Sequence, residues 1–126
     1  MINAVTLIFP HQLFKHHPAV SAGRKVFLVE EWLFFCQYQF IKQKLVLHRA
    51  SMQFYKSYLQ KQSFECEYIC ATDKNCDIRL LIPFLAKQGI NEIHYADVAD
   101  NWLEKRIVKS AADYQINTVK YPTPNF

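Results

Sequence analysis

Five short apolar runs, separated by longer mixed segments, constrain the fold of this 126-residue chain more than any other feature. They fall at residues 4–9, 25–30, 64–70, 92–95 and 117–121, and runs such as "VFLVE" and "NTVKY" are typical of parallel strands buried on both faces. Most of the connecting segments are long enough for a helix, which gives the strand–helix–strand alternation of α/β proteins. The sequence therefore predicts one α/β domain with a parallel sheet and right-handed crossovers.

Segment 41–60 has the clearest helical pattern. Its apolar residues recur at steps of four and three, which places them on one stripe of a helix that packs against the sheet. The stripe consists of Ile41, Leu45, His48, Met52, Tyr55 and Leu59, and the opposite, solvent-exposed face of Lys42, Arg49, Gln53, Lys56 and Gln60.

Two further helices are predicted from their end signals. Asp77 is a candidate N-cap and Gly89 a candidate residue after the last turn, while Pro83 between them predicts a kink or a later start. The last helix is introduced by Asp100 or Asn101. The residues of this helix expected to face the sheet are Leu103, Ile107, Ala111 and Tyr114.

The chain contains only two glycines, Gly23 and Gly89, and this scarcity excludes two large classes of nucleotide-binding protein. A dinucleotide fingerprint needs three glycines beside the first strand, and a P-loop needs two glycines and a Gly-Lys-Ser/Thr sequence. The Gly-x-Ser-x-Gly sequence of an ordinary α/β-hydrolase is also missing. No Ser-His-Asp set, carboxylate pair or metal-ligand spacing stands out, so the sequence offers no catalytic set.

Composition places further bounds on partners and location. The net charge of +4 permits a nucleic-acid partner without requiring one. Four cysteines without Cys-x-x-Cys spacing predict buried or idle thiols in a reducing compartment. No apolar run approaches the roughly 20 residues of a membrane span, and the first residues lack the pattern of a signal peptide. We expect a cytoplasmic protein with no membrane partner.

Polar residues follow three of the predicted strands. The carboxyl ends of parallel strands share one edge of the sheet, where open α/β sheets bind their ligands. This cluster suits hydrogen bonding to a flat heterocycle or a sugar; alternatively, Gln12 and Asp97 cap helices. The residues are Pro10, His11 and Gln12 after the first strand, Glu30 and Glu31 after the second, and Asp97 after the fourth.

Several basic residues outside this cluster have two interpretations each. His48 lies on the apolar stripe, where it either lines a pocket between helix and sheet or is a core histidine. Lys44 and Arg49 belong to a basic half-helix that faces solvent or contacts phosphate. We expect His16 and His17 to lie in an exposed loop.

Three stretches, "TLIFPHQLF", "VFLVEEWLFF" and "KQKLVLHRASMQFY", resemble the amino-terminal domain of deoxyribodipyrimidine photolyase-related proteins. These form the bacterial branch of the cryptochrome/photolyase family that is similar to the iron–sulfur (6-4) photolyases. The chain departs from the family pattern at Pro10 and His11, which replace a glycine and an acid, and at Phe34, where lumazine-binding relatives keep a carboxylate. The most specific matches lie in the long helix, at Lys42, Lys44, Ala50, Ser51, Met52 and Tyr55.

The resemblance implies a fold and a domain organisation. Residues 1–121 would be a three-layer, Rossmann-like antenna domain whose five-stranded parallel sheet has the order 3-2-1-4-5, with helices on both faces. Residues 122–126 would begin a linker to a helical carboxyl-terminal domain. In this family, that domain holds FAD and a [4Fe–4S] cluster and binds damaged DNA, so the parent protein would be a DNA photolyase.

The resemblance also implies a second chromophore in the amino-terminal domain, of the ribityl-lumazine type, which passes excitation energy to the flavin. A flat pigment without a pyrophosphate needs a slot and edge hydrogen bonds rather than a glycine loop. The residues expected to bind it are Pro10, His11, Gln12, Glu30, Glu31, Phe34, Lys44, His48 and Asp97.

Two other functions remain open from the sequence. The chain could be a stand-alone Rossmann-like nucleotide-binding protein, with its ligand at the strand-end edge. It could also be a regulatory interaction domain that docks through the aromatic residues at 32–35. In the photolyase interpretation, this chain alone catalyses nothing and retains no flavin.

Overall fold

The computed structural model describes residues 3–10, 12–31, 42–70, 72–98 and 101–123, with side chains in the first long helix described from Arg49 onward. All five predicted strands are confirmed, with ends that shift by no more than two residues. In chain order the elements are β1 (Ala4–Ile8), β2 (Lys25–Val29), α2 (Lys42–Lys61), β3 (Cys66–Ile69), the 3₁₀ turn η1 (Lys74–Cys76), α3 (Ile78–Lys87), β4 (Glu92–Ala96), α4 (Asn101–Asp113) and β5 (Asn117–Tyr121).

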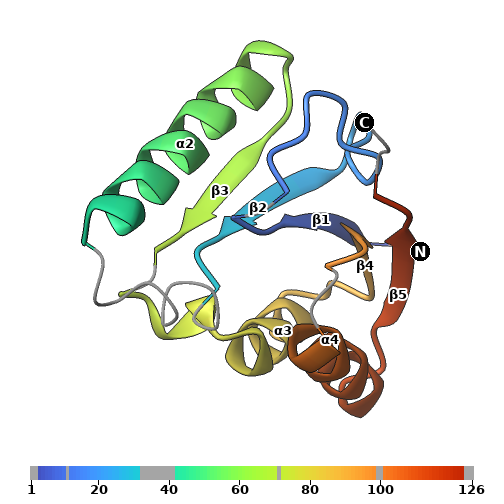
Figure 1. Ribbon diagram of the computed structural model, residues 1–126. Coiled ribbons are helices and arrows are strands. Elements are labelled where there is room, and N and C mark those ends of the chain that lie inside the picture. Colours follow the sequence, from blue (N-terminus) through green and yellow to red (C-terminus); the bar gives the residue numbers. More distant parts are fainter. Residues whose placement is uncertain (1–2, 11, 32–41, 71, 99–100, 124–126) are drawn as a thin grey trace.

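The strands form one parallel sheet in the order β3-β2-β1-β4-β5, as the family resemblance implied. The chain begins in the middle of the sheet, runs outward to β3 and then returns to add β4 on the other side of β1 (Figure 1). The order therefore reverses between β1 and β4, and in open α/β sheets this reversal opens a crevice at the carboxyl ends of the strands.

Helices cover both faces of the sheet, which confirms the three-layer arrangement. α3 and α4 lie together on one side and α2 lies on the other (Figure 1). Side chains of β1 and β2 alternate between the two sides: Leu7 and Phe27 belong to the larger core under α3 and α4, whereas Ile8 and Leu28 pack in a smaller core with α2. The predicted stripe of α2 is confirmed where its side chains are described, because Met52, Tyr55 and Leu59 are all buried.

The connection from β1 to β2 departs from the expected alternation. Residues 9–24, of which all but His11 are described, contain no helix. This β1–β2 loop is instead held to the sheet by polar contacts. The Thr6 hydroxyl donates to the Ala19 carbonyl at 2.7 Å, and the Arg24 guanidinium donates to the Thr6 hydroxyl oxygen and to the Ala19 carbonyl. An irregular loop thus takes the place of a first crossover helix.

The predicted helix ends are largely confirmed. Asp77 accepts a hydrogen bond from the Arg79 amide at 2.9 Å, and Gly89 follows the last turn of α3 with φ of +85°. Pro83 neither delays nor divides α3, which begins directly after Asp77. The expectation for Tyr114 is wrong: its side chain is 49% exposed, because α4 ends at Asp113 and Tyr114 leaves the helical stripe.

The two edge strands are less buried than predicted. β5 was expected to be buried on both faces, but all of its residues are exposed or half-buried, because an edge strand has a neighbour on one side only. Each edge carries a charged pair: Glu67 on β3 with Lys25 at 3.2 Å, and Lys120 on β5 with Glu104 at 3.3 Å. None of the described helices has the length and apolar character to cross a membrane.

Candidate functional site

Gln12 joins the carboxyl ends of β1 and β4. Its side chain is fully buried, and its amide nitrogen donates to the backbone carbonyls of Ala96 at 2.9 Å and Asp97 at 3.0 Å. Its own backbone amide donates to the Phe9 carbonyl at 3.0 Å, which closes a turn around the buried Pro10. Gln12 therefore lies at the point where the strand order reverses, as the sequence predicted, and bonds across it.

The side-chain oxygen of Gln12 is buried and has no hydrogen-bond partner among the described residues. A buried amide oxygen without a partner costs free energy unless a ligand or water supplies a donor. A flat heterocycle with a ring N–H is one such donor, so the chemistry of this position fits the edge of a pigment or base.

Glu30, at the end of β2, is fully buried in a network of three side chains. Arg49 donates to its two carboxylate oxygens at 2.8 and 2.9 Å, and the Tyr68 hydroxyl donates to one of the same oxygens. The pKa of Arg49 is raised by its hydrogen bond to Glu30. The pKa of Tyr68 is raised by burial and by its own hydrogen bond to Glu30, so both groups keep their protons. This network links β2, β3 and α2.

Glu31 is also buried, but it points to the other side of the sheet. Its carboxylate accepts a hydrogen bond from the backbone amide of Ile78, the first residue of α3, at 2.8 Å. A carboxylate at this position satisfies an amide without a helical partner and interacts favourably with the helix dipole. Glu31 therefore has a structural role in stabilising the start of α3.

The other predicted site residues are placed less fully. Asp97 is half-buried next to Gln12, and its backbone amide donates to the Tyr121 carbonyl at 2.8 Å. Lys44 and His48 lie in the first half of α2, with side chains outside the described set. His11 and Phe34 lie outside the described residues altogether.

Two partners of Glu30 were not identified from the sequence. Arg49 was assigned to the solvent-exposed face of α2, and it is half-exposed, yet its guanidinium reaches the buried carboxylate. Tyr68 was simply part of a predicted strand. The available signal was the glutamate itself, because a carboxylate directly after a buried strand usually requires a cationic partner.

The expectation for His17 is wrong: its side chain is 7% exposed. Its Nδ1 accepts a hydrogen bond from the Ala19 amide at 3.2 Å, and its ring lies against Phe14. Burial lowers the pKa of His17 from 6.5 to about 4, so the ring is neutral at pH 7 and carries its proton on Nε2. That N–H has no partner among the described residues.

A second polar cluster lies on the sheet surface, within strands that the sequence indicated were apolar. Nδ1 of His94 lies 2.9 Å from the Tyr121 hydroxyl, and its Nε2 lies 2.6 Å from a Glu92 oxygen and 3.1 Å from Arg24 Nη1. These contacts join β4 and β5 to the end of the β1–β2 loop. Across the described part of the chain, no group of three or more His, Cys, Asp or Glu side chains is arranged to hold a metal ion.

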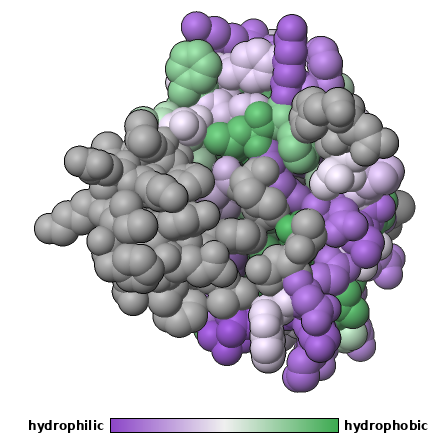
Figure 2. All heavy atoms as spheres, viewed as in Figure 1, coloured by the Kyte–Doolittle hydropathy of each residue, from purple (hydrophilic) through white to green (hydrophobic). Residues whose placement is uncertain are grey.

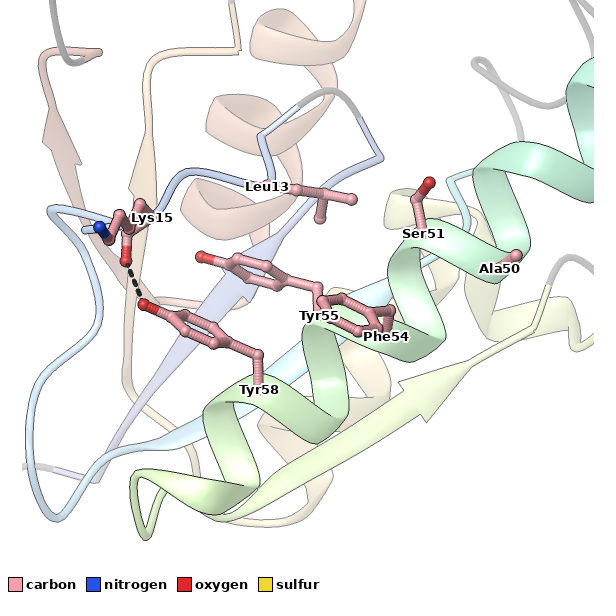
Figure 3. A pocket seen from close by; sticks show the side chains of 7 residues that line it. All are labelled: Leu13, Lys15, Ala50, Ser51, Phe54, Tyr55 and Tyr58. Atoms are coloured by element: carbon pink, nitrogen blue, oxygen red, sulfur yellow. Dashed lines mark hydrogen bonds between the residues drawn. The ribbon is translucent and has the colours of Figure 1, made fainter.

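An open groove of about 690 Å³ separates α2 from the β1–β2 loop. Figure 2 shows hydrophobic side chains in the upper middle of one face of the molecule and hydrophilic ones along its upper and right-hand rim. In Figure 3 the rings of Tyr55 and Tyr58 project from α2 towards the loop that carries Leu13 and Lys15, and the exposed Phe54 lies beside Tyr55 on the helix. Ala50 and Ser51 complete the lining. Leu13 directly follows Gln12, so one end of this α2–loop groove begins next to the predicted site.

Comparison with known proteins identifies relatives of the chain. Residues 6–126 match the family model described as deoxyribodipyrimidine photo-lyase-related protein. An uncharacterized protein of Acanthamoeba polyphaga mimivirus, R852, is 28% identical over 130 residues. The alignment covers 97% of this chain and 65% of that relative, so the chain spans about two thirds of the viral protein.

Proposed function

The chain belongs to the deoxyribodipyrimidine photolyase-related family, and from this premise we propose that it is the light-harvesting domain of a photolyase- or cryptochrome-like flavoprotein that repairs DNA. The observation that carries the proposal is the family match, which extends over residues 6–126. The strand order β3-β2-β1-β4-β5 is the order that the resemblance implied for an antenna domain.

In this proposal the carboxyl edge of the sheet holds a ribityl-lumazine chromophore of the iron–sulfur (6-4) photolyase-like branch. The unpartnered oxygen of Gln12 accepts a hydrogen bond from the pigment, and Asp97 lies beside it. Glu30 is fixed by Arg49 and forms part of the wall rather than a free ligand group. His11, Phe34, Lys44 and His48 are proposed to complete the slot.

The proposed chemistry of repair belongs to a different domain. FAD and a [4Fe–4S] cluster would be held by a helical domain that follows the linker at residues 122–126, and that domain would bind damaged DNA. The chromophore supplies absorption of light and transfer of excitation to the flavin. The residues of this chain would bind it, orient it and exclude water from it.

A titration tests the proposal. We expect a ribityl-lumazine to bind the chain saturably, with a change in its fluorescence, and His48→Leu to weaken binding because His48 is proposed to line the slot. Gln60→Ala is the matched control, since Gln60 is an exposed residue of the same helix. Unchanged lumazine fluorescence would contradict chromophore binding by this chain. FAD recovered in stoichiometric amount with residues 1–126 would contradict the proposed division between the domains.

A further inference from the structure

We propose that the α2–loop groove is a binding site for a planar aromatic ring that carries an anionic group, a ligand of the size and chemistry of a nucleoside monophosphate. This site is separate from the chromophore slot proposed at the carboxyl edge of the sheet. The groove is formed by the middle of α2 on one side and by the residues after Gln12 on the other (Figure 3).

The size of the groove fits a small ligand. Its volume of about 690 Å³ falls within the range of roughly 300–1,000 Å³ that is usual for small-molecule sites. Ala50 and Tyr58, at its two ends, are eight residues apart on one helix, which corresponds to about 12 Å. A purine or pteridine ring with a sugar and one phosphate spans a similar length.

The aromatic lining favours a flat ring. Phe54 and Tyr55 both line the groove, and Phe54 is 77% exposed whereas the neighbouring Tyr55 is buried. An aromatic ligand placed against Phe54 would gain offset or edge contacts and would cover a side chain that is otherwise in water. Ser51, on the same helix, adds a hydroxyl group for a ring or sugar edge.

The groove is fixed before any ligand arrives. Tyr55 donates its hydroxyl to the Phe14 carbonyl at 2.6 Å, and Tyr58 donates to the Lys15 carbonyl at 3.0 Å. Burial raises the pKa of Tyr55, so its hydroxyl keeps the proton that this bond requires. Because these two bonds hold the loop to the helix, a ligand would bind without the cost of ordering the loop.

The charge of the two segments that border the groove favours an anion. Residues 10–25 contain three Lys or Arg and residues 42–61 contain five, and neither segment contains an Asp or a Glu. Two of these cations are neutralised, Arg49 by Glu30 and Lys25 by Glu67. Lys15 is the charged residue among those that line the groove, and no acidic partner of it is seen among the described residues. Its ammonium is therefore the group proposed to bind a phosphate or carboxylate.

The test separates the ring from the anion by isothermal titration calorimetry with AMP, adenosine and ribose 5-phosphate. We expect AMP to bind more tightly than either fragment. Phe54→Ala should weaken AMP and adenosine by about fivefold, the size of an aromatic contact. Lys15→Ala should weaken AMP by about fivefold as well and leave adenosine unchanged. Both side chains are exposed, so neither variant should affect folding.

A matched pair on the other side of the sheet is the control. Trp102 on α4 is 71% exposed, with the Lys105 ammonium 5.9 Å from its ring, so it offers an aromatic and a cation without the groove. Trp102→Ala with Lys105→Ala should leave the affinity for AMP unchanged. An affinity for AMP that is unaffected by Phe54→Ala and Lys15→Ala, or no saturable binding, would overturn the proposal.

Competition distinguishes this site from the chromophore slot. If the two sites are separate, a saturating ribityl-lumazine should leave the AMP affinity unchanged, and Phe54→Ala should not alter lumazine binding. If lumazine displaces AMP and also loses affinity in Phe54→Ala, the groove is the chromophore site itself and the separate nucleotide site is overturned. Lumazine binding without AMP binding overturns the groove proposal and leaves the proposed function standing.

Discussion

Arg49, from a helix on one face of the sheet, binds both carboxylate oxygens of Glu30 at the end of strand β2. The arginine is half-exposed and the glutamate is fully buried. A buried carboxylate depends strongly on its cationic partner, because removal of that partner leaves a charge without compensation. This pair therefore fixes the position of α2 relative to the carboxyl edge of the sheet.

Arg49→Ala should lower the free energy of unfolding by about 3 kcal/mol, since it leaves the Glu30 carboxylate buried with one partner fewer. Urea denaturation followed by circular dichroism measures the change. Arg49→Lys should recover only part of the loss, because an ammonium group cannot bind both oxygens in the same plane.

A double-mutant cycle separates the pair from the loss of the arginine's packing. Glu30→Gln with Arg49→Ala should cost clearly less than the sum of the single changes, because the neutral amide no longer needs the guanidinium. Strict additivity of the two changes would show that the ion pair does not couple α2 to the sheet.

Gln12→Met should destabilise the fold by about 2 kcal/mol, because it removes the buried side-chain hydrogen bonds to the Ala96 and Asp97 carbonyls. Gln12→Glu should cost more at pH 7, since a carboxylate oxygen would face two carbonyl oxygens. Its excess cost should shrink at pH 5, because protonation restores a donor. Unfolding curves of both variants at the two pH values measure this, and equal costs at both would contradict the bridging role of the amide.

His17 should make folding sensitive to acid. Its pKa is about 4 in the folded state and 6.5 when unfolded, so the unfolded chain binds more protons between these values and stability falls as pH decreases through this window. The contribution of His17 to the free energy of unfolding is fully present above pH 6.5, and about 3 kcal/mol of it is lost by pH 4. His17→Asn, which keeps an acceptor for the Ala19 amide, should flatten the pH dependence of unfolding between pH 6.5 and 4.

The neighbouring His16 provides the control for this experiment, because it is the same residue type in an exposed position. His16→Asn should leave the pH dependence of the wild-type protein unchanged. A His17→Asn variant that loses stability with acid as steeply as the wild type would exclude His17 as the source.

Gly89→Ala should cost about 1 kcal/mol through backbone strain alone. Gly89 has φ of +85°, and a Cβ atom there would meet nothing closer than the Asn3 amide nitrogen at 4.0 Å. The cost therefore comes from the left-handed conformation rather than from a clash. In thermal unfolding, stability should decrease in the order glycine, asparagine, alanine at position 89. An alanine variant as stable as the wild type would be inconsistent with backbone strain as the origin of the cost.

The strands of this fold could be predicted because strands buried in a sheet are continuous apolar runs, which can be recognised in the sequence alone. The β1–β2 loop could not be predicted, since the contacts that Ala19 and Arg24 make with each other and with Thr6 of β1 have no local signal in the sequence. Tyr114 was assigned to the core from helical periodicity, which does not reveal that α4 ends one residue earlier.

The place where the polar residues after the strands gather was predictable from the sequence, but their contacts were not. Glutamine and acids after parallel strands must gather at one edge, and Gln12 and Asp97 do. The hydrogen-bond partners of these polar side chains come from distant elements and have no local signal. The Glu31 carboxylate accepts from the start of α3, whereas the side-chain oxygen of Gln12 has no partner among the described residues. His17 was missed for the same reason, because a loop that packs on a sheet has the polar composition of an exposed loop.

The sheet ends on both sides in short strands that carry charge, Glu67 on β3 and Lys120 on β5. Addition of a further strand, from a second molecule or from a partially unfolded chain, would bring these ionic groups next to a foreign backbone and disturb their pairs. Growth of the sheet into fibrillar aggregates is thereby discouraged, and concentrated solutions of the domain should stay clear.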